Sequence, residues 1–217
     1  MVIAIDGPAG SGKSTIAKLM AEKLTGKDGH EFSYINSGNL YRAITFGCLG
    51  AKIDLTNSEK VVEFAKNIKI TCQKDQVFID GEDVTPLLHT DEIDKNSAPL
   101  SAIVPVRHIV NDLVRSLSEG KNIVVEGRDM TTVVFPDTPY RFYLDATADS
   151  RAKRRFDQKV SNLSLEEIKS AILARDEIDM NKIEGSLKIA EGVQYLDTSD
   201  LTIIQVYDKL KERIDKK

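Results

Sequence analysis

The order of apolar and polar positions along the chain predicts buried strands that alternate with amphipathic helices. Short apolar runs with the character of strands buried on both faces lie at Val2–Ile5, Phe32–Ile35, Asn122–Val125, Tyr140–Leu144 and Glu191–Leu196. Helical spacing is found in Thr15–Leu24, from Ser37 onward, and in Thr56–Ala65, Pro105–Leu117, Asp149–Lys159, Ser164–Met180 and Thr202–Ile214. This alternation predicts an α/β fold, a parallel five-stranded sheet flanked by helices, with ligands at the carboxyl ends of the strands.

The period of the apolar positions changes to two between residues 68 and 85, which is typical of strands. Turn signals at Lys74-Asp75 and Asp80-Gly81 divide this stretch into three short strands. A three-stranded meander inside an otherwise α/β chain is expected to be an insert rather than part of the main sheet. The stretch from His89 to Leu100 has no clear pattern, so its structure stays open.

Composition and charge narrow the class of protein. With 217 residues, 41% of them hydrophobic and 29% charged, the chain can bury one α/β core plus an insert. Its formal net charge of −4 argues against a general nucleic-acid binder, which usually carries a basic excess. Cys48 and Cys72 form no C-x-x-C pair and fit free thiols in a reducing compartment. Asp6 interrupts the apolar opening run, so we expect a cytoplasmic protein with neither membrane nor nucleic-acid partners.

The first predicted strand runs into a glycine-rich segment that fits G-x-x-x-x-G-K-[ST], the phosphate loop of nucleotide-binding enzymes. Its residues are Gly7, Pro8, Ala9, Gly10, Ser11, Gly12, Lys13, Ser14 and Thr15. Backbone N–H groups of such a loop, and the positive end of the helix that follows, surround the phosphates. Lys13 is expected to reach the β- and γ-phosphates, and the Ser14 hydroxyl to hold Mg²⁺. The sequence therefore predicts a binding site for ATP or a related nucleoside polyphosphate.

A phosphate loop does not name the reaction. A regulatory GTPase would usually carry D-x-x-G and N-K-x-D motifs, neither of which occurs here, and mechanical ATPases are normally larger. A small phosphotransferase fits better, because its acceptor phosphate needs a second pocket rich in arginine. Candidates for that pocket lie at Arg42, Arg107, Arg128 and Arg175. Taken singly, each is also compatible with a solvated helix face, as is the trio Arg151, Arg154 and Arg155.

Several segments, in this order, resemble the nucleoside monophosphate kinases and, within them, the bacterial cytidylate kinases. They are Ile5-Asp6-Gly7-Pro8, the stretch from Asn36 to Arg42, the stretch from Gly127 to Asp137, Arg175-Asp176 with Asp179, and Leu196-Asp197-Thr198-Ser199. The resemblance covers nearly the whole chain and implies phosphorylation of CMP or dCMP by ATP. It also implies a single kinase unit with a core (1–36, 101–150 and 190–217), a monophosphate-binding segment with the β insert (37–100) and a helical lid (151–189).

The resemblance also implies roles for individual residues. Those expected to bind CMP are Ser37, Tyr41, Arg42, Ser101, Arg107, Arg128, Asp129, Arg175, Asp179 and Lys182. The catalytic group is expected to be Lys13, Arg128 and Arg175. Within the CMP set, Arg107 and Asp129 resemble the pair that reads cytosine. A carboxylate beside a guanidinium matches the amino donor and ring acceptors of cytosine, whereas uracil would turn a carbonyl toward Asp129, so CMP should be preferred over UMP.

Some positions depart from the family pattern. Asn36 stands where Asp is common, Thr131 replaces a usual Gly, and Lys182 occupies the place of a lid arginine. A serine that contacts the base in relatives has no clean counterpart, and Ser97 and Ser101 are both candidates. A kinase for UMP, AMP or shikimate, or a nucleotide-binding regulator without activity, would share the loop and differ in the acceptor pocket. The expected reaction is an in-line transfer by a monomer whose lid excludes water.

Overall fold

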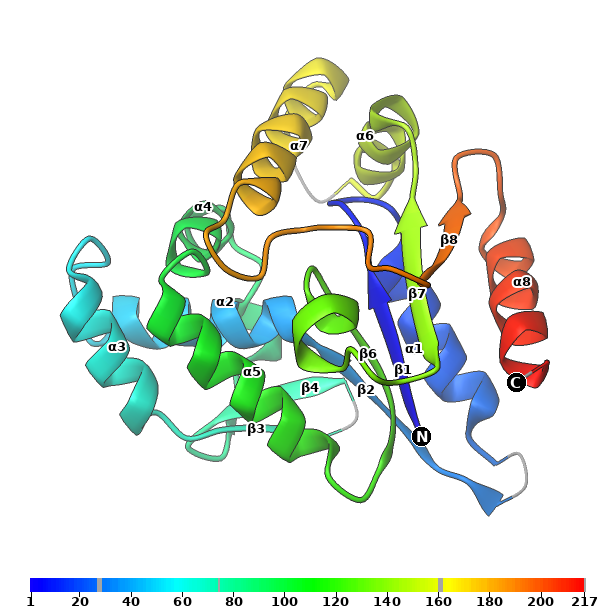
Figure 1. Ribbon diagram of the computed structural model, residues 1–217. Coiled ribbons are helices and arrows are strands. Elements are labelled where there is room, and N and C mark those ends of the chain that lie inside the picture. Colours follow the sequence, from blue (N-terminus) through cyan, green and yellow to red (C-terminus); the bar gives the residue numbers. More distant parts are fainter. Residues whose placement is uncertain (27–28, 74, 160–161, 217) are drawn as a thin grey trace.

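The computed structural model describes residues 1–26, 29–73, 75–159 and 162–216, and its core is a parallel β-sheet. The strands are ordered β2-β6-β1-β7-β8, and every neighbouring pair is parallel. Their bounds are β1 Val2–Asp6, β2 Phe32–Asn36, β6 Asn122–Gly127, β7 Tyr140–Asp145 and β8 Gln194–Asp197. The parallel five-stranded sheet predicted from the apolar runs is confirmed (Figure 1).

Helices cover both faces of the sheet because successive strand residues point to opposite sides. On one face, Ile3 and Ile5 pack with α1 (Lys13–Leu24) and α8 (Ile203–Asp215). On the other face, Ala4 belongs to a second core. That core is completed by α2 (Ser37–Gly50), α3 (Ser58–Asn67), α5 (Val104–Ser118) and a π-helical turn, η3 (Met130–Val134). With both faces covered by helices, a ligand can approach the sheet at the carboxyl ends of its strands.

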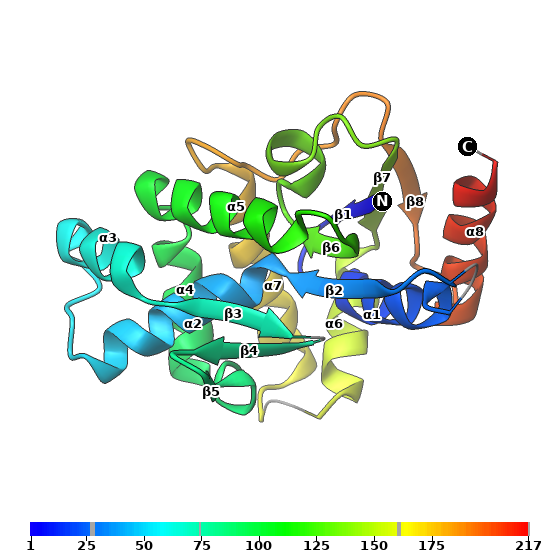
Figure 2. The same ribbon diagram turned by 90° about the horizontal axis from the view of Figure 1, so that it is seen from below.

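The predicted meander forms a separate small sheet of β3 (Ile70–Gln73), β4 (Gln76–Ile79) and β5 (Glu82–Asp83). Asp80 and Gly81 both have positive φ, as a tight hairpin turn requires. Lys74, in the other predicted turn, lies outside the described residues. Figure 2 shows this sheet beside α2, against which β4 packs.

The stretch that the sequence left open continues from a short 3₁₀ turn, η2 (Thr85–Leu87), into helix α4 (Asp91–Leu100). The helix begins at an N-cap, where the Thr90 side chain accepts from the Ile93 N–H. Its pattern was hidden because Pro99, a residue type that usually breaks a helix, lies inside it. This helix supplies one wall of the site described below.

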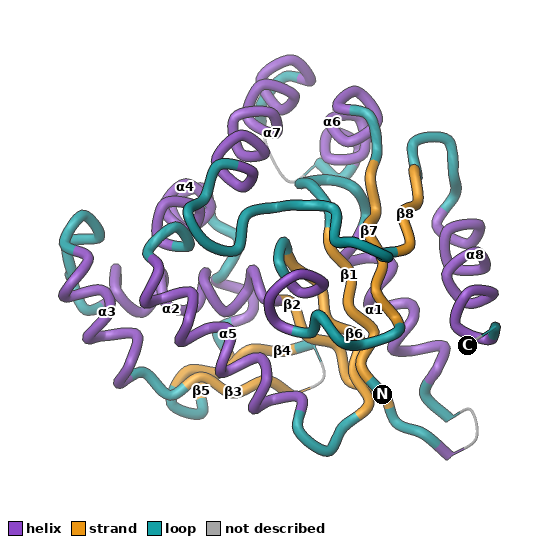
Figure 3. The backbone as a smooth tube through the Cα atoms, in the orientation of Figure 1, coloured by secondary structure: helices purple, strands orange, loops and turns teal. Residues whose placement is uncertain are grey.

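Two helices, α6 (Ala148–Asp157) and α7 (Leu165–Met180), stand beyond the carboxyl ends of the strands. Ala152 on α6 and Ile168 and Ile172 on α7 form a small core of their own. In Figure 3 this pair lies above the sheet, and a long connection returns from α7 to β8. Because the pair has its own apolar contacts, it is a distinct layer over the strand ends.

Element boundaries differ from the predictions at several points. The first helix begins at Lys13 rather than Thr15, directly after Gly12 in the left-handed region (φ 92°). The last strand begins at Gln194 rather than Glu191, because a turn closed by a bond from the Val193 N–H to the Ala190 carbonyl precedes it. Within the described residues, we find no helix with the length and apolar character needed to span a membrane.

Candidate functional site

A cavity of about 150 Å³ opens at the carboxyl ends of β1 and β6, between the glycine-rich loop and the α6–α7 layer. All ten side chains predicted for the acceptor pocket line it, from Ser37 to Lys182. From the loop itself, Ala9, Gly10, Lys13 and Ser14 line the cavity. The other predicted loop residues, Gly7, Pro8, Ser11, Gly12 and Thr15, shape the loop without lining the cavity. The two predicted halves of the site therefore meet in one space.

The loop is shaped by close backbone packing. A Cβ at Gly7 would lie 2.0 Å from the Leu144 carbonyl oxygen, so only glycine fits where the loop passes the end of β7. The Lys13 ammonium donates to the Pro8 carbonyl at 2.7 Å and lies 3.4 Å from the Ser11 hydroxyl. Burial, and next the Arg128 charge, lower the pKa of Lys13 to about 7. The carbonyl and hydroxyl partners of this buried ammonium are uncharged, and a bound polyphosphate would supply an anionic one.

Two oxygen groups lie together where the loop enters α1. The Ser14 hydroxyl donates to Glu126 Oε1 at 2.6 Å, and the Tyr34 hydroxyl donates to the same oxygen at 3.2 Å. A hydroxyl and a carboxylate are the hard oxygen ligands that Mg²⁺ prefers, so this donor set fits that ion. Elsewhere in the described chain, no group of three or more His, Cys, Asp or Glu is arranged to hold a metal. The sequence places Glu126 directly after an apolar strand, at the end of the sheet where ligands bind, but it assigned this residue no role toward a metal.

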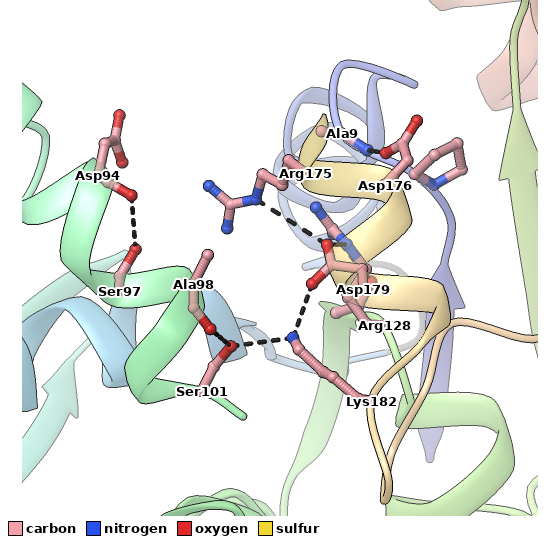
Figure 4. Close-up of polar contacts among 12 residues, drawn as sticks. Ala9, Asp94, Ser97, Ala98, Ser101, Arg128, Arg175, Asp176, Asp179 and Lys182 are labelled. Carbon is pink, nitrogen blue, oxygen red and sulfur yellow. Dashed lines mark hydrogen bonds and ion pairs between the residues drawn. The ribbon is translucent and has the colours of Figure 1, made fainter. Parts of the chain in front are cut away.

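On the opposite wall, Asp179 of α7 collects three cations (Figure 4). Its carboxylate accepts from Arg128 Nε at 2.7 Å and from the Lys182 ammonium at 2.6 Å, and Arg175 Nε lies 3.9 Å away. Burial alone would raise the pKa of Asp179, but Arg128 and Lys182 hold it well below its usual range. Burial, and next the charges of Arg128 and Arg42, lower the pKa of Arg175 to about 10. This wall holds more positive than negative charge, which suits an anion.

A second carboxylate sits within the same cationic region. Asp94 of α4 accepts from Arg42 Nε at 2.9 Å and from Arg155 of α6 at 3.4 Å. These two ion pairs join α4 to α2 and to α6. The Nε side of Arg42 is thereby occupied. Arg155 lines the cavity and is therefore not merely a solvated residue of α6. Sequence reasoning missed Asp94, because it lies in the stretch whose structure stayed open.

The far end of the cavity holds a buried ion pair. Arg107 of α5 donates to Asp129 at 2.5 Å and to the Ser101 carbonyl at 2.8 Å. Its guanidinium also lies over the Tyr41 ring, 5.8 Å from the centroid. The Tyr41 hydroxyl is buried and finds no hydrogen-bond partner among the described residues. That hydroxyl is a free polar group facing this end of the site.

The connection after α7 covers this ion pair. The Gly185 carbonyl accepts from Arg107 at 3.2 Å, and a Cβ at Gly185 would lie only 2.0 Å from Arg107 Nη2. Both serine candidates, Ser97 and Ser101, line the cavity. Only Ser101 is bonded to Lys182, whose ammonium donates to the Ser101 hydroxyl at 2.9 Å. The lysine at 182 therefore links α7 to the α4–α5 turn, which carries Ser101.

Thr131, a departure from the family pattern, has a structural partner. Its hydroxyl and its N–H both donate to Asp6 Oδ2, at 2.6 and 2.7 Å, and the Met130 N–H donates to the other oxygen at 3.0 Å. Burial raises the pKa of Asp6 to about 6, although the hydrogen bonds from Thr131 oppose the shift. Asp6 thus ties β1 to the turn that carries Asp129, and the hydroxyl of Thr131 adds a bond that glycine would lack.

Comparison with known proteins indicates the same family as the sequence motifs. The family model described as "Cytidylate kinase" matches residues 3–216. A cytidylate kinase from Caldanaerobacter subterraneus subsp. tengcongensis is 41% identical over 217 residues, covering 99% of this chain and 94% of its own. One from Thermodesulfovibrio yellowstonii is 39% identical, covering 98% of this chain and 97% of its own. Among solved structures, an uncharacterized protein from Eubacterium ventriosum shares the fold, with a TM-score of 0.56, 13% identity and coverage of 100% and 99% of the two chains.

Proposed function

The chain belongs to the cytidylate kinase family, and we propose that its cavity carries out the family's reaction between two facing anion sites. As a cytidylate kinase it transfers the γ-phosphoryl group of ATP to CMP, which yields ADP and CDP. The observation that carries the proposal is the single cavity shared by Lys13 and the cations of the opposite wall. We extend the proposal to dCMP, because its phosphate and its base are those of CMP.

In this proposal, the enzyme acts by positioning and charge neutralisation rather than by a nucleophilic side chain. The loop amides and Lys13 hold the donor phosphates, and Arg42 and Arg128 hold the acceptor phosphate. Arg175, whose buried Nε has no hydrogen-bond partner among the described residues, is free to neutralise charge on the transferring group. Lys13, Arg128 and Arg175 are therefore the proposed catalytic residues.

The base would be read at the buried Arg107–Asp129 pair. Cytosine offers an amino donor to the carboxylate and ring acceptors to the guanidinium, whereas uracil would present a carbonyl to Asp129. Tyr41 and Ser101 are proposed to shape this end, with Ser37 at the start of α2. Asp179 and Lys182 are proposed to contact the ribose or phosphate once the Gly185 segment has made room for the base.

The donor set at Ser14 and Glu126 supports Mg²⁺ as the divalent ion. When bound there, Mg²⁺ would supply charge neutralisation to the ATP phosphates. Glu126 accepts from Ser14 and Tyr34, and these bonds hold the two oxygen groups together at the start of α1. A titration with Mn²⁺, used in place of Mg²⁺ because it is paramagnetic, tests this assignment. Glu126→Gln should weaken the ATP-dependent binding of Mn²⁺, measured by electron paramagnetic resonance, about tenfold or more.

We further propose that the chain divides into a core (1–36, 101–150 and 190–217), a monophosphate-binding segment (37–100) and a lid (151–189). We also propose that the enzyme is a cytoplasmic monomer. The separate apolar core of α6 and α7 supports a lid that moves as one piece. Sedimentation at micromolar concentration tests the monomer, and a mass twice that of the chain would contradict it.

A substrate comparison tests the function directly. ADP release is measured with CMP, dCMP, UMP, AMP and shikimate as acceptors, for the wild type and for Asp129→Ala. We expect CMP and dCMP to be preferred over UMP by about 10²-fold or more, and the preference to shrink in the variant. A preference for AMP or shikimate would reject the acceptor assignment. ATP binding with no transfer to any acceptor would indicate a regulator.

A further inference from the structure

The helix α7 carries a second buried carboxylate, Asp176, one turn before Asp179. The two contact different partners: Asp179 pairs with Arg128, whereas Asp176 accepts a hydrogen bond from the phosphate loop (Figure 4). Asp176 Oδ1 accepts from the Ala9 N–H at 3.2 Å, and Oδ2 accepts from Arg151 at 2.5 Å. Both oxygens of a side chain that is 5% exposed therefore accept hydrogen bonds.

Arg151, the partner of Asp176 on α6, contacts the same residue of the loop. Arg151 Nη1 also donates to the Ala9 carbonyl at 3.0 Å, and its Nε donates to the Ala146 carbonyl at 2.9 Å. A Cβ at Gly10 would lie 3.1 Å from the Arg151 Cβ, so the loop packs directly against α6. The N–H and the carbonyl of Ala9 are thus held from two different helices of the upper layer.

These contacts connect the shape of the loop to the position of α7. The bond from the Ala9 N–H to a carboxylate is charge-assisted, and in a buried setting such a bond is stronger than a neutral one. Residues three apart lie on the same face of a helix, so α7 cannot seat Asp176 on the loop without bringing Asp179 to the acceptor wall. Arg175 moves with them.

We propose that Asp176 is a positioning residue that couples the seating of α7 on the acceptor side to the ATP-ready shape of the phosphate loop. The catalytic purpose of this coupling rests on the proposed function. The contact itself, between the loop and α7, does not depend on it. Asp176 touches neither substrate in this proposal. It acts through the Ala9–Gly10 backbone and through Arg151.

The test compares Asp176→Ala with Asp149→Ala. Asp149 forms an exposed ion pair with Lys169 at 2.6 Å, which joins the same two helices without touching the loop. Asp176→Ala should lower kcat by about 10- to 100-fold and raise KM for ATP several-fold, because small misplacements of a positioned group are costly. KM for CMP at saturating ATP should change by less than about twofold. Asp149→Ala should leave all three constants within about twofold of the wild type.

A readout without turnover separates positioning from general loss of structure. In the free enzyme, hydrogen exchange at the Ala9 and Gly10 amides should be at least about tenfold faster in Asp176→Ala, while the amides of β1 and β6 keep wild-type exchange. If Asp176→Ala is unfolded at the assay temperature, Asp176→Asn decides by the same readouts, because it keeps an acceptor for Ala9 but turns an amino group toward Arg151.

Equal loop exchange and equal kcat in the Asp176 and Asp149 variants would overturn the proposal. So would faster exchange spread over the whole sheet, because that indicates a stabilising role only. The proposed function fails differently, by a wild type that does not phosphorylate CMP, and the exchange experiment would still report on the loop contact in that case.

Discussion

The proposed donor site lies within Gly7–Thr15, whereas the proposed acceptor side is formed by side chains from α2, the α4–α5 turn, the end of β6 and α7. The loop relies on backbone direction, which depends on glycines such as Gly7 and on the start of α1. The acceptor side relies on guanidinium groups that approach from separate elements. One site is therefore local in the sequence and the other exists only in the folded chain.

The two sides also balance their charges differently. On the loop, Lys13 is held by a carbonyl oxygen and a hydroxyl. On the acceptor side, carboxylates pair with the cations, as Asp94 does with Arg42 and Asp179 with Arg128. A phosphate entering the acceptor side meets groups that already have partners, so losing one cation there should weaken the site in steps. Losing Lys13 should remove the main cation of the donor side at once.

The largest effect is therefore expected at Lys13. Lys13→Ala should lower kcat by about 10³-fold, because a buried charge aimed at the reacting phosphates is lost. Stability should not fall, since the buried ammonium has a lowered pKa and costs free energy in the free enzyme. Steady-state kinetics and a thermal melt check both points. A variant with more than a tenth of wild-type kcat would contradict the donor assignment.

Arg128→Lys tests the acceptor side. Lysine keeps a charge near Asp179 but loses the planar fork, so kcat/KM for CMP should fall by about 10- to 100-fold with KM for ATP little changed. The matched control is Arg115→Lys on α5, an arginine whose guanidinium donates to the carbonyls of Val133 and Val134. An equal loss in both variants would show that Arg128 has no special role toward CMP.

The pH dependence sharpens the contrast between the two sides. With its pKa lowered to about 7, Lys13 is charged below that pH in the free enzyme and neutral above it. Because phosphates bind the charged form, kcat/KM for ATP should fall by up to about tenfold per pH unit above 7, while kcat stays flat. Bound phosphates would raise the pKa again. A flat kcat/KM for ATP between about pH 6.5 and 8.5 would contradict a proton requirement at Lys13.

The smallest effect is expected at Thr131, which bonds to Asp6 and so ties the turn that carries Asp129 to β1. Thr131→Ala removes the hydroxyl bonded to Asp6 and should lower the free energy of unfolding by about 1–2 kcal/mol with kcat within about twofold. It should also raise the pKa of Asp6 further. Thr132→Ala is the control, because the Thr132 hydroxyl has no hydrogen-bond partner in the described chain. Denaturant unfolding distinguishes the two, and equal losses would argue against the Asp6 bond.

The difference between the two sides also explains what the sequence could predict. The strands and the loop were readable because apolar runs and a glycine spacing are local patterns. The arginine candidates could be named one by one, but only the resemblance assigned them to one acceptor site, since nothing local relates Arg42 to Arg128. Asp94 was missed, and Glu126 was placed at the ligand end of its strand without a role, because the importance of both comes from partners far along the chain, Arg42 and Ser14. The interlayer contacts of Arg151 and Arg154 were likewise out of reach, because a charged helix face looks the same whether it is solvated or bonded.

Gly185 carries no functional group, yet it lies against the ion pair between Arg107 and Asp129 with no room for a methyl group. Its backbone also has positive φ, which side chains other than glycine adopt with strain. The segment can therefore pack on the Arg107–Asp129 pair only as backbone without a side chain. Substitutions at this position should be poorly tolerated, a restriction that comes from space and backbone conformation together and that a survey of reactive side chains would overlook.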